Sequence, residues 1–163
     1  MYNMVIACLT VCGLILKSVF PRALSVAWTV PDFLLLIVIF NAMFMGTSHG
    51  TVVGIMVGLI EDLYVGRFIG LNILAKCAVG AMCGSLSKSI FKENMWVPVI
   101  NVFLGSCISF IIVFLVGSMV GLRWNFASVL FQGAFEVVLN VCLVPFLYGP
   151  FFKFARERVQ YIE

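Results

Sequence analysis

Residues 96–120 read WVPVINVFLGSCISFIIVFLVGSMV, without a charged side chain, and this stretch indicates the class of fold that the chain adopts. A transmembrane helix needs about 20 consecutive, mainly apolar residues, so the stretch is long enough to cross a bilayer. The rest of the chain has the same character, since 63% of its 163 residues are hydrophobic and 10% are charged. Soluble domains are about half apolar and one quarter charged. The sequence therefore predicts an all-α integral membrane protein.

Five further apolar segments are separated from this one by short breaks that contain glycine or polar residues. Together the six segments predict one transmembrane domain over residues 1–163, a compact bundle of six transmembrane helices. The expected helices cover residues 4–16, 31–45, 51–65, 71–86, 96–120 and 126–152, with a basic tail at 153–163. The second and third reach only about 22 Å at 1.5 Å per residue, against a hydrocarbon core of about 30 Å.

Charges in the breaks indicate the orientation of the chain, because basic residues favour the cytoplasmic side of a membrane. Six spans place both termini on one side. If that side is cytoplasmic, the basic residues inside are Lys88, Lys92, Lys153, Arg156 and Arg158, and those outside are Lys17, Arg22, Arg67 and Arg123. Three of the inner residues follow the last span, so we expect both termini in the cytoplasm. The net charge of +3 is scattered, which makes nucleic acid an unexpected partner.

Glycines recur at every fourth position in three segments. Gly50, Gly54 and Gly58 lie on one face of the third segment, Gly80 and Gly84 repeat the spacing on the fourth, and Gly117 and Gly121 repeat it at the end of the fifth. Helices in lipid associate where small residues let their backbones approach closely. This pattern favours tight packing inside the bundle over the binding of another chain.

Three polar residues of the last segment, Gln132, Glu136 and Asn140, are spaced four apart and therefore share one helix face. A charge near the bilayer centre costs about 2.5 to 3.5 kcal/mol, so this face should be turned toward protein or an internal cavity. Lys76 is the leading candidate as a partner of Glu136, with Asn101 and Asn72 as alternatives. A hydrogen-bonded packing stripe is favoured over a transported-ion or ligand site.

No residue pattern in the chain indicates catalysis. Glu61 and Asp62 are adjacent carboxylates, but neighbours on a helix point about 100° apart, so we expect them to cap and fix the following loop. The motifs G-x-S-x-G and H-E-x-x-H are absent. The six cysteines form no C-x-x-C pair and are expected as buried free thiols. The sequence predicts no enzyme and no catalytic, cofactor-binding or metal site.

An ordered series of residues runs through most of the chain. The series consists of Pro31-Asp32-Phe33-Leu34-Leu35-Leu36, Gly54, Gly58-Leu59, Asp62, Gly66, Gly70-Leu71-Asn72, Gly80 and Gly84, then Asn140, Pro145, Leu147 and Tyr148 before the basic tail. This series resembles the family of the rod shape-determining protein MreD. Physical roles can be assigned to four of these residues. Pro31 suits a helix start, and Asp32 can accept hydrogen bonds from the free N–H groups there. Gly70 permits a turn whose backbone groups Asn72 can satisfy.

The resemblance implies a non-catalytic, multi-pass protein of the bacterial cytoplasmic (inner) membrane. Such a protein supports rod shape and lateral peptidoglycan synthesis as part of the cell-elongation complex. Its implied partners are MreC, bound directly, and the MreB filament, RodA and a penicillin-binding transpeptidase, within the lipid bilayer. No cofactor is implied.

An alternative function belongs to another class. Proteins of the MreD family are similar in size, helix count and fold to the substrate-binding subunits of energy-coupling-factor vitamin transporters. Those subunits commonly carry small residues four apart on the first helix, whereas here Ala7 is followed by Val11. Their substrate cavity would lie near Asn72, Lys76 and Glu136 in this chain. Vitamin binding by the purified protein would distinguish the two functions.

Overall fold

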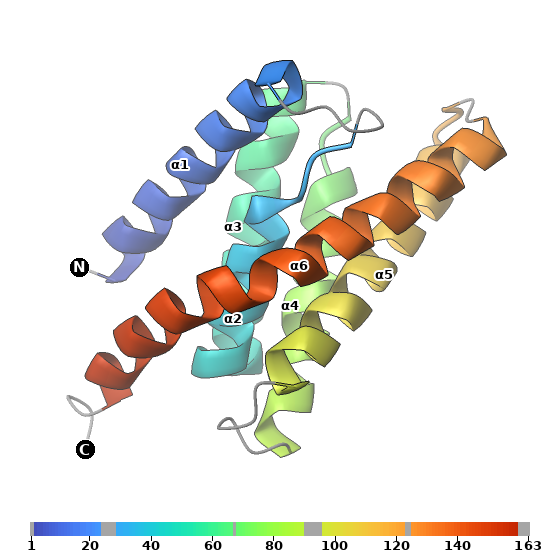
Figure 1. Ribbon diagram of the computed structural model, residues 1–163. Helices are drawn as coiled ribbons and strands as arrows, with labels where there is room; N and C mark the ends of the chain where they lie inside the picture. Colours follow the sequence, from blue (N-terminus) through green and yellow to red (C-terminus); the bar gives the residue numbers. More distant parts are fainter. Residues whose placement is uncertain (1, 24–28, 67, 90–95, 123–124, 160–163) are drawn as a thin grey trace.

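The computed structural model describes residues 2–23, 29–66, 68–89, 96–122 and 125–159, and these contain six α-helices (Figure 1). The helices are α1 (Tyr2–Ala23), α2 (Phe33–Met45), α3 (Thr47–Val65), α4 (Leu71–Ser89), α5 (Trp96–Met119) and α6 (Phe126–Val159). The prediction of an all-α chain with six helices is thus confirmed over the described residues. Helix α1 extends beyond the expected segment 4–16 at both ends, and α6 continues past residue 152 into the basic tail.

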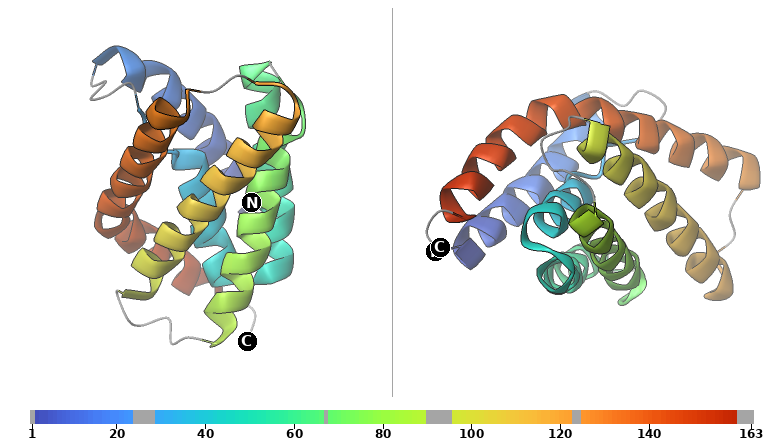
Figure 2. Two further views of the ribbon diagram at one scale, coloured as in Figure 1. Left: turned by 90° about the vertical axis from the view of Figure 1, so that its right-hand side faces the viewer. Right: turned by 90° about the horizontal axis from the view of Figure 1, so that it is seen from below.

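Helix α2 lies at the centre of the bundle and contacts each of the other five helices. Figure 2 shows it enclosed by its neighbours. Every residue from Leu34 to Met43 is buried. Apart from Asn41, its residues are apolar on all sides, as expected of a helix with no exposed face. At 13 residues it is about 20 Å long, and this short length is compatible with a position surrounded by protein rather than lipid.

Helices α3 and α4 pack backbone against backbone through their glycines. A Cβ atom on Gly58 would lie 2.6 Å from the Ile73 Cα atom, and one on Gly54 would overlap the Lys76 carbonyl oxygen. On α4, a Cβ atom on Gly84 would lie 2.5 Å from the Thr47 Cα atom. No larger residue fits at these positions without moving a helix. The tight internal packing expected from the glycine spacing is what the structure contains.

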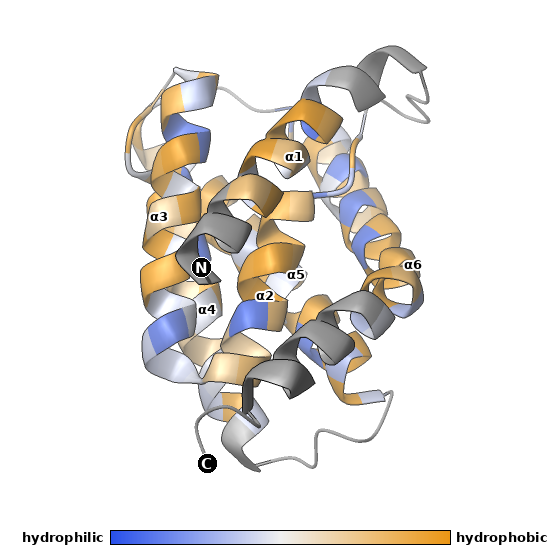
Figure 3. Ribbon diagram, turned by 90° about the vertical axis from the view of Figure 1, so that its left-hand side faces the viewer, coloured by the Kyte–Doolittle hydropathy of each residue, from blue (hydrophilic) through white to orange (hydrophobic). Residues whose placement is uncertain are grey.

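Large apolar side chains lie exposed on every helix except α2, among the residues that the structure describes. Examples are Leu63 on α3, Met119 on α5 and Phe146 on α6, which are 63%, 85% and 77% exposed. Figure 3 shows the predominance of apolar positions along the helices. A surface with so much exposed apolar area is suited to lipid or to other proteins.

Two helical segments of the described chain are long and apolar enough to cross a membrane by themselves, Trp96–Met119 and Phe126–Gly149. Shorter apolar helical segments cover Cys8–Ser18, Phe33–Met45 and Leu71–Ser87. The ends of α1, α3 and α5 and the starts of α4 and α6 lie at the same end of the bundle, uppermost in Figure 1. Several polar residues of the interior lie close to these helix ends.

Candidate functional site, a buried charge network

Lys76 carries a positive charge into the interior of the bundle. The side chain lies on the first turns of α4 and is only 1% exposed. Its Nζ atom is 2.9 Å from Oδ2 of Asp32, and it also contacts the Glu61 carboxylate on α3. A buried ammonium is tolerated only where opposite charges and hydrogen bonds replace its water. Two carboxylates perform that function for Lys76.

The position of the Asp32 side chain is fixed by its role as the N-cap of α2. Its Oδ1 atom accepts hydrogen bonds from the backbone N–H groups of Leu34 and Leu35, both at 3.1 Å. These are two of the N–H groups that the first helical turn leaves unpaired, and the helix dipole favours an anion at this end. Oδ1 therefore caps α2 while Oδ2 binds Lys76. The sequence predicts that Asp32 caps a helix, and the structure contains this cap. The hydrogen bond from Lys76 to Asp32 is not among the sequence predictions.

Glu61 joins α1 to the same network. One of its carboxylate oxygens contacts Lys76 and the other contacts the ammonium of Lys17, whose side chain is 30% exposed. Two expectations from the sequence are corrected here. Glu61 pairs with lysines of other helices instead of capping a loop, and Lys17 belongs to helix α1 instead of a connecting segment. Glu61 and Asp62 point to different surroundings because neighbours on a helix diverge by about 100°.

Asn140 extends the network to the last two helices. Its Oδ1 atom accepts a hydrogen bond from the backbone N–H of Asp32 at 2.9 Å. Its Nδ2 atom donates to Oγ of Ser106 on α5 at 3.0 Å. The side chain is fully buried, at 0% exposure. Asn140 therefore ties α5 and α6 to the N-terminus of α2.

The completed network draws on all six helices. Its members are Lys17 from α1, Asp32 at the start of α2, Glu61 from α3, Lys76 from α4, Ser106 from α5 and Asn140 from α6. The two lysines and two carboxylates have formal charges that cancel. A neutral, hydrogen-bonded cluster of this kind is the form in which charges are found inside membrane proteins. Its evident consequence is to specify how the six helices assemble.

Asp62 lies next to Glu61 in sequence but organises the link from α3 to α4. Its carboxylate accepts hydrogen bonds from the backbone N–H groups of Gly70 (2.8 Å), Asn72 (3.1 Å) and Ile73 (3.2 Å), and from Nδ2 of Asn72 (2.8 Å). Gly70 has a φ of 114°, a backbone conformation that residues other than glycine rarely adopt. The loop-fixing role expected for Asp62 is confirmed.

Replacing Asp62 with alanine should loosen this link without dismantling the bundle. The donors are partly accessible to water, so we expect a loss of about 1 to 3 kcal/mol in the free energy of unfolding, the range for unpaired buried donors. Limited proteolysis in detergent should then cut between α3 and α4. Ser85→Ala is a suitable control, because Ser85 is exposed and bonds only within α4. Equal protease resistance of both variants would contradict the assignment.

The polar stripe of α6 is divided between two surroundings. Asn140 is in the core, Gln132 is exposed, and Glu136 is partly exposed. The pairing of Glu136 with Lys76 expected from the sequence is not the one that the structure contains, because the Lys76 ammonium bonds to carboxylates of α2 and α3. Glu136 lies within electrostatic range of Lys76 without a direct contact. Asn101, the alternative partner, donates to the Val97 carbonyl of its own helix.

Three members of the network were not singled out by sequence reasoning as an interacting set: Lys17, Glu61 and Ser106. For two of them, the sequence contains a feature that indicates a partner of opposite charge. Lys17 and Glu61 each lie beside or within an apolar segment, where an ionised side chain needs a partner of opposite charge. Ser106 gave no such signal, since serine is common at helix contacts in membranes.

The network carboxylates are occupied by lysines, and Asp62 is occupied by N–H groups. Among the described residues, no group of three or more His, Cys, Asp or Glu side chains could hold a metal ion. Cys8, Cys12 and Cys142 are exposed free thiols, which corrects the expectation that all the cysteines are buried.

An apolar surface over a bundle that is joined internally by paired charges is characteristic of a helical membrane protein. Comparison with protein families assigns the chain more narrowly. The family model of the rod shape-determining protein MreD matches residues 1–158, and the chain belongs to that family. It is thus a membrane protein of the kind that determines rod shape in bacteria. Neither a curated protein nor a solved structure matched the chain.

Proposed function

We propose that this protein is a non-catalytic, multi-pass subunit of the cell-elongation complex in the bacterial cytoplasmic membrane, and that it acts by binding MreC. The match to the MreD family over residues 1–158 is the observation that carries the proposal. The complex also contains, in this proposal, MreB, RodA and a penicillin-binding transpeptidase. Through it the protein supports lateral peptidoglycan synthesis and rod shape.

The proposal includes six membrane spans with both termini in the cytoplasm. The network agrees with six spans, because its ion pairs and hydrogen bonds connect five helices with the N-cap of α2 in one bundle. The position of Lys17 supports this orientation. Lys17 lies in helix α1 and pairs with Glu61, so it is not counted among the basic residues of the loops. Removing it changes the balance of basic residues from five inside and four outside to five and three. This larger excess agrees with a cytoplasmic C-terminus.

A scaffolding role agrees with the chemistry of the interior. Acid–base catalysis needs a titratable group free to exchange a proton with a substrate. The titratable groups at the centre of the network, Asp32, Glu61 and Lys76, instead bind one another. The same contacts give the bundle a defined shape, which a binding partner such as MreC could recognise.

Depletion of the protein in its rod-shaped host should test the function. We expect cells to become round as the protein is lost and to return to rods when the intact gene is expressed. Purification of the tagged protein from cells should recover MreC at a defined ratio. Cells that stay rod-shaped after complete loss would overturn the proposal, and a vitamin-uptake defect in the same cells would favour the transporter function instead.

A further inference from the structure

Glu136 differs from the other acidic side chains that the structure describes. Asp32 and Glu61 form ion pairs with lysines, and Asp62 accepts hydrogen bonds from the link to α4. Within the described part of the chain, Glu136 has neither a hydrogen-bond partner nor an ion-pair partner. Its carboxylate is within electrostatic range of the network, but the network is already neutral and has no free cation to offer.

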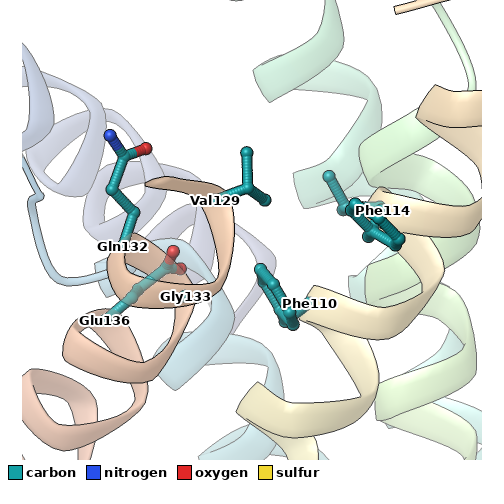
Figure 4. Close-up of a pocket in the computed structure, with 7 residues that line it drawn as sticks. Phe110, Phe114, Val129, Gln132, Gly133 and Glu136 are labelled. Atoms are coloured by element: carbon teal, nitrogen blue, oxygen red, sulfur yellow. The ribbon is translucent and has the colours of Figure 1, made fainter. Parts of the chain in front are cut away.

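Glu136 lines a pocket of about 160 Å³ between α5 and α6. Figure 4 shows Gln132 and Glu136 side by side on α6, with the rings of Phe110 and Phe114 on α5 across from them. The remaining lining residues are Val113, Val129 and Gly133. The pocket thus combines one carboxylate, one amide and two aromatic rings. Carboxylate and amide oxygens accept hydrogen bonds, and aromatic faces attract cations.

The depth of the pocket in the membrane indicates which kind of cationic group could reach it. Glu136 follows the first residue of α6, Phe126, by ten positions. At 1.5 Å per residue this is about 15 Å, close to the middle of a hydrocarbon core of about 30 Å. Lipid amines lie at the membrane surface and would have to leave it to reach this depth. A side chain from another transmembrane helix reaches it directly.

We propose that the pocket formed by Gln132, Glu136, Phe110 and Phe114 is a docking site for a transmembrane helix of another protein that carries a Lys or Arg side chain near its middle. Charge complementarity carries this assignment: the pocket has an unpaired carboxylate in an apolar wall, and about 160 Å³ accommodates one long side chain. A second copy of this chain is a poorer occupant, because its Lys17 and Lys76 are bound internally. The inference does not depend on MreC being the partner.

The test uses the purified full-length protein in lipid nanodiscs and synthetic transmembrane peptides as probes. One peptide is a leucine-rich helix with a central lysine, and matched peptides carry leucine or glutamate at that position. Energy transfer between labelled protein and labelled peptide reports binding. We expect the lysine peptide to bind about tenfold more tightly than the leucine peptide, and the glutamate peptide to bind no better than leucine.

Variants of the pocket make the test specific. Glu136→Gln should abolish the preference for lysine while keeping the fold, because glutamine has nearly the same shape. Glu136→Lys should reverse it in favour of the glutamate peptide. Val138→Leu alters an exposed position of α6 outside the pocket and should leave the preference unchanged. Equal binding of all three peptides would overturn the proposal. A lysine preference that survives in Glu136→Gln would overturn it too, as would energy transfer between labelled copies of the protein that depends on Glu136.

Discussion

Replacing Lys76 with methionine should be among the most damaging single changes in this protein. Methionine keeps much of the side-chain volume but leaves Asp32 and Glu61 facing each other without the cation that both contact. Breaking a buried ion pair by removing one partner costs about 3 to 5 kcal/mol. We expect Lys76→Met to lower the thermal unfolding temperature in detergent sharply and to reduce the yield of folded protein.

Double-mutant cycles should identify the partners of Lys76. Combining Lys76→Met with Asp32→Asn or Glu61→Gln removes a stranded charge, so each double variant should recover part of the loss. Glu136→Gln is the matched comparison, because it neutralises a carboxylate that Lys76 does not contact. Its coupling to Lys76→Met should be weaker than that of Asp32→Asn or Glu61→Gln, because Glu136 acts on Lys76 only at a distance. Strong coupling to Glu136, with none to Asp32 and Glu61, would contradict the network.

Gly54→Ala should be the second large effect. The added Cβ atom would overlap the Lys76 carbonyl oxygen, which belongs to the backbone of α4 and cannot rotate away. Helices α3 and α4 would have to separate, and the separation would also disturb the charge network. Overpacking lowers the free energy of unfolding by about 1 to 3 kcal/mol. Because the contact here is with the backbone, we expect Gly54→Ala to lower it by about 3 kcal/mol. Thermal unfolding in detergent would measure it.

Gly149→Ala is the matched control for this change. Gly149 also lies within a helix, but an added Cβ atom there would meet nothing within 4 Å. Alanine favours a helix over glycine by about 1 kcal/mol, so this variant should be unchanged or slightly more stable. If both alanine variants unfold at the temperature of the unaltered protein, the close packing of α3 against α4 is wrong.

The helices and the presence of closely packed glycine faces could be predicted from the sequence because both depend on local patterns, whereas the pairing of α3 with α4 could not. An apolar run predicts a helix in lipid, and glycines at Gly50, Gly54 and Gly58 identify the face that another helix approaches. Helix ends were less predictable. Lys17 interrupts an apolar run and was assigned to a loop, but α1 continues past it because Glu61 satisfies its charge.

The candidate site was predicted in part. The sequence links Asp32 to a helix end, Asp62 to a turn and Asn140 to a polar stripe, and each of them makes hydrogen bonds in the structure. The partner of Lys76 was not. Depth along the helices suggested Glu136, whereas the structure places Asp32 and Glu61 against the ammonium.

The sequence by itself determined that this is a helical membrane protein of the MreD family, because composition, apolar runs and motif order are read along the chain. Only the tertiary structure decided which charges meet. Lys76 and Asp32 are 44 residues apart, as are Lys17 and Glu61, and no local pattern relates such positions. Their contact depends on how six helices are rotated and offset against one another. A rotation of about 100°, one residue along a helix, would turn Asp62 instead of Glu61 toward the lysines.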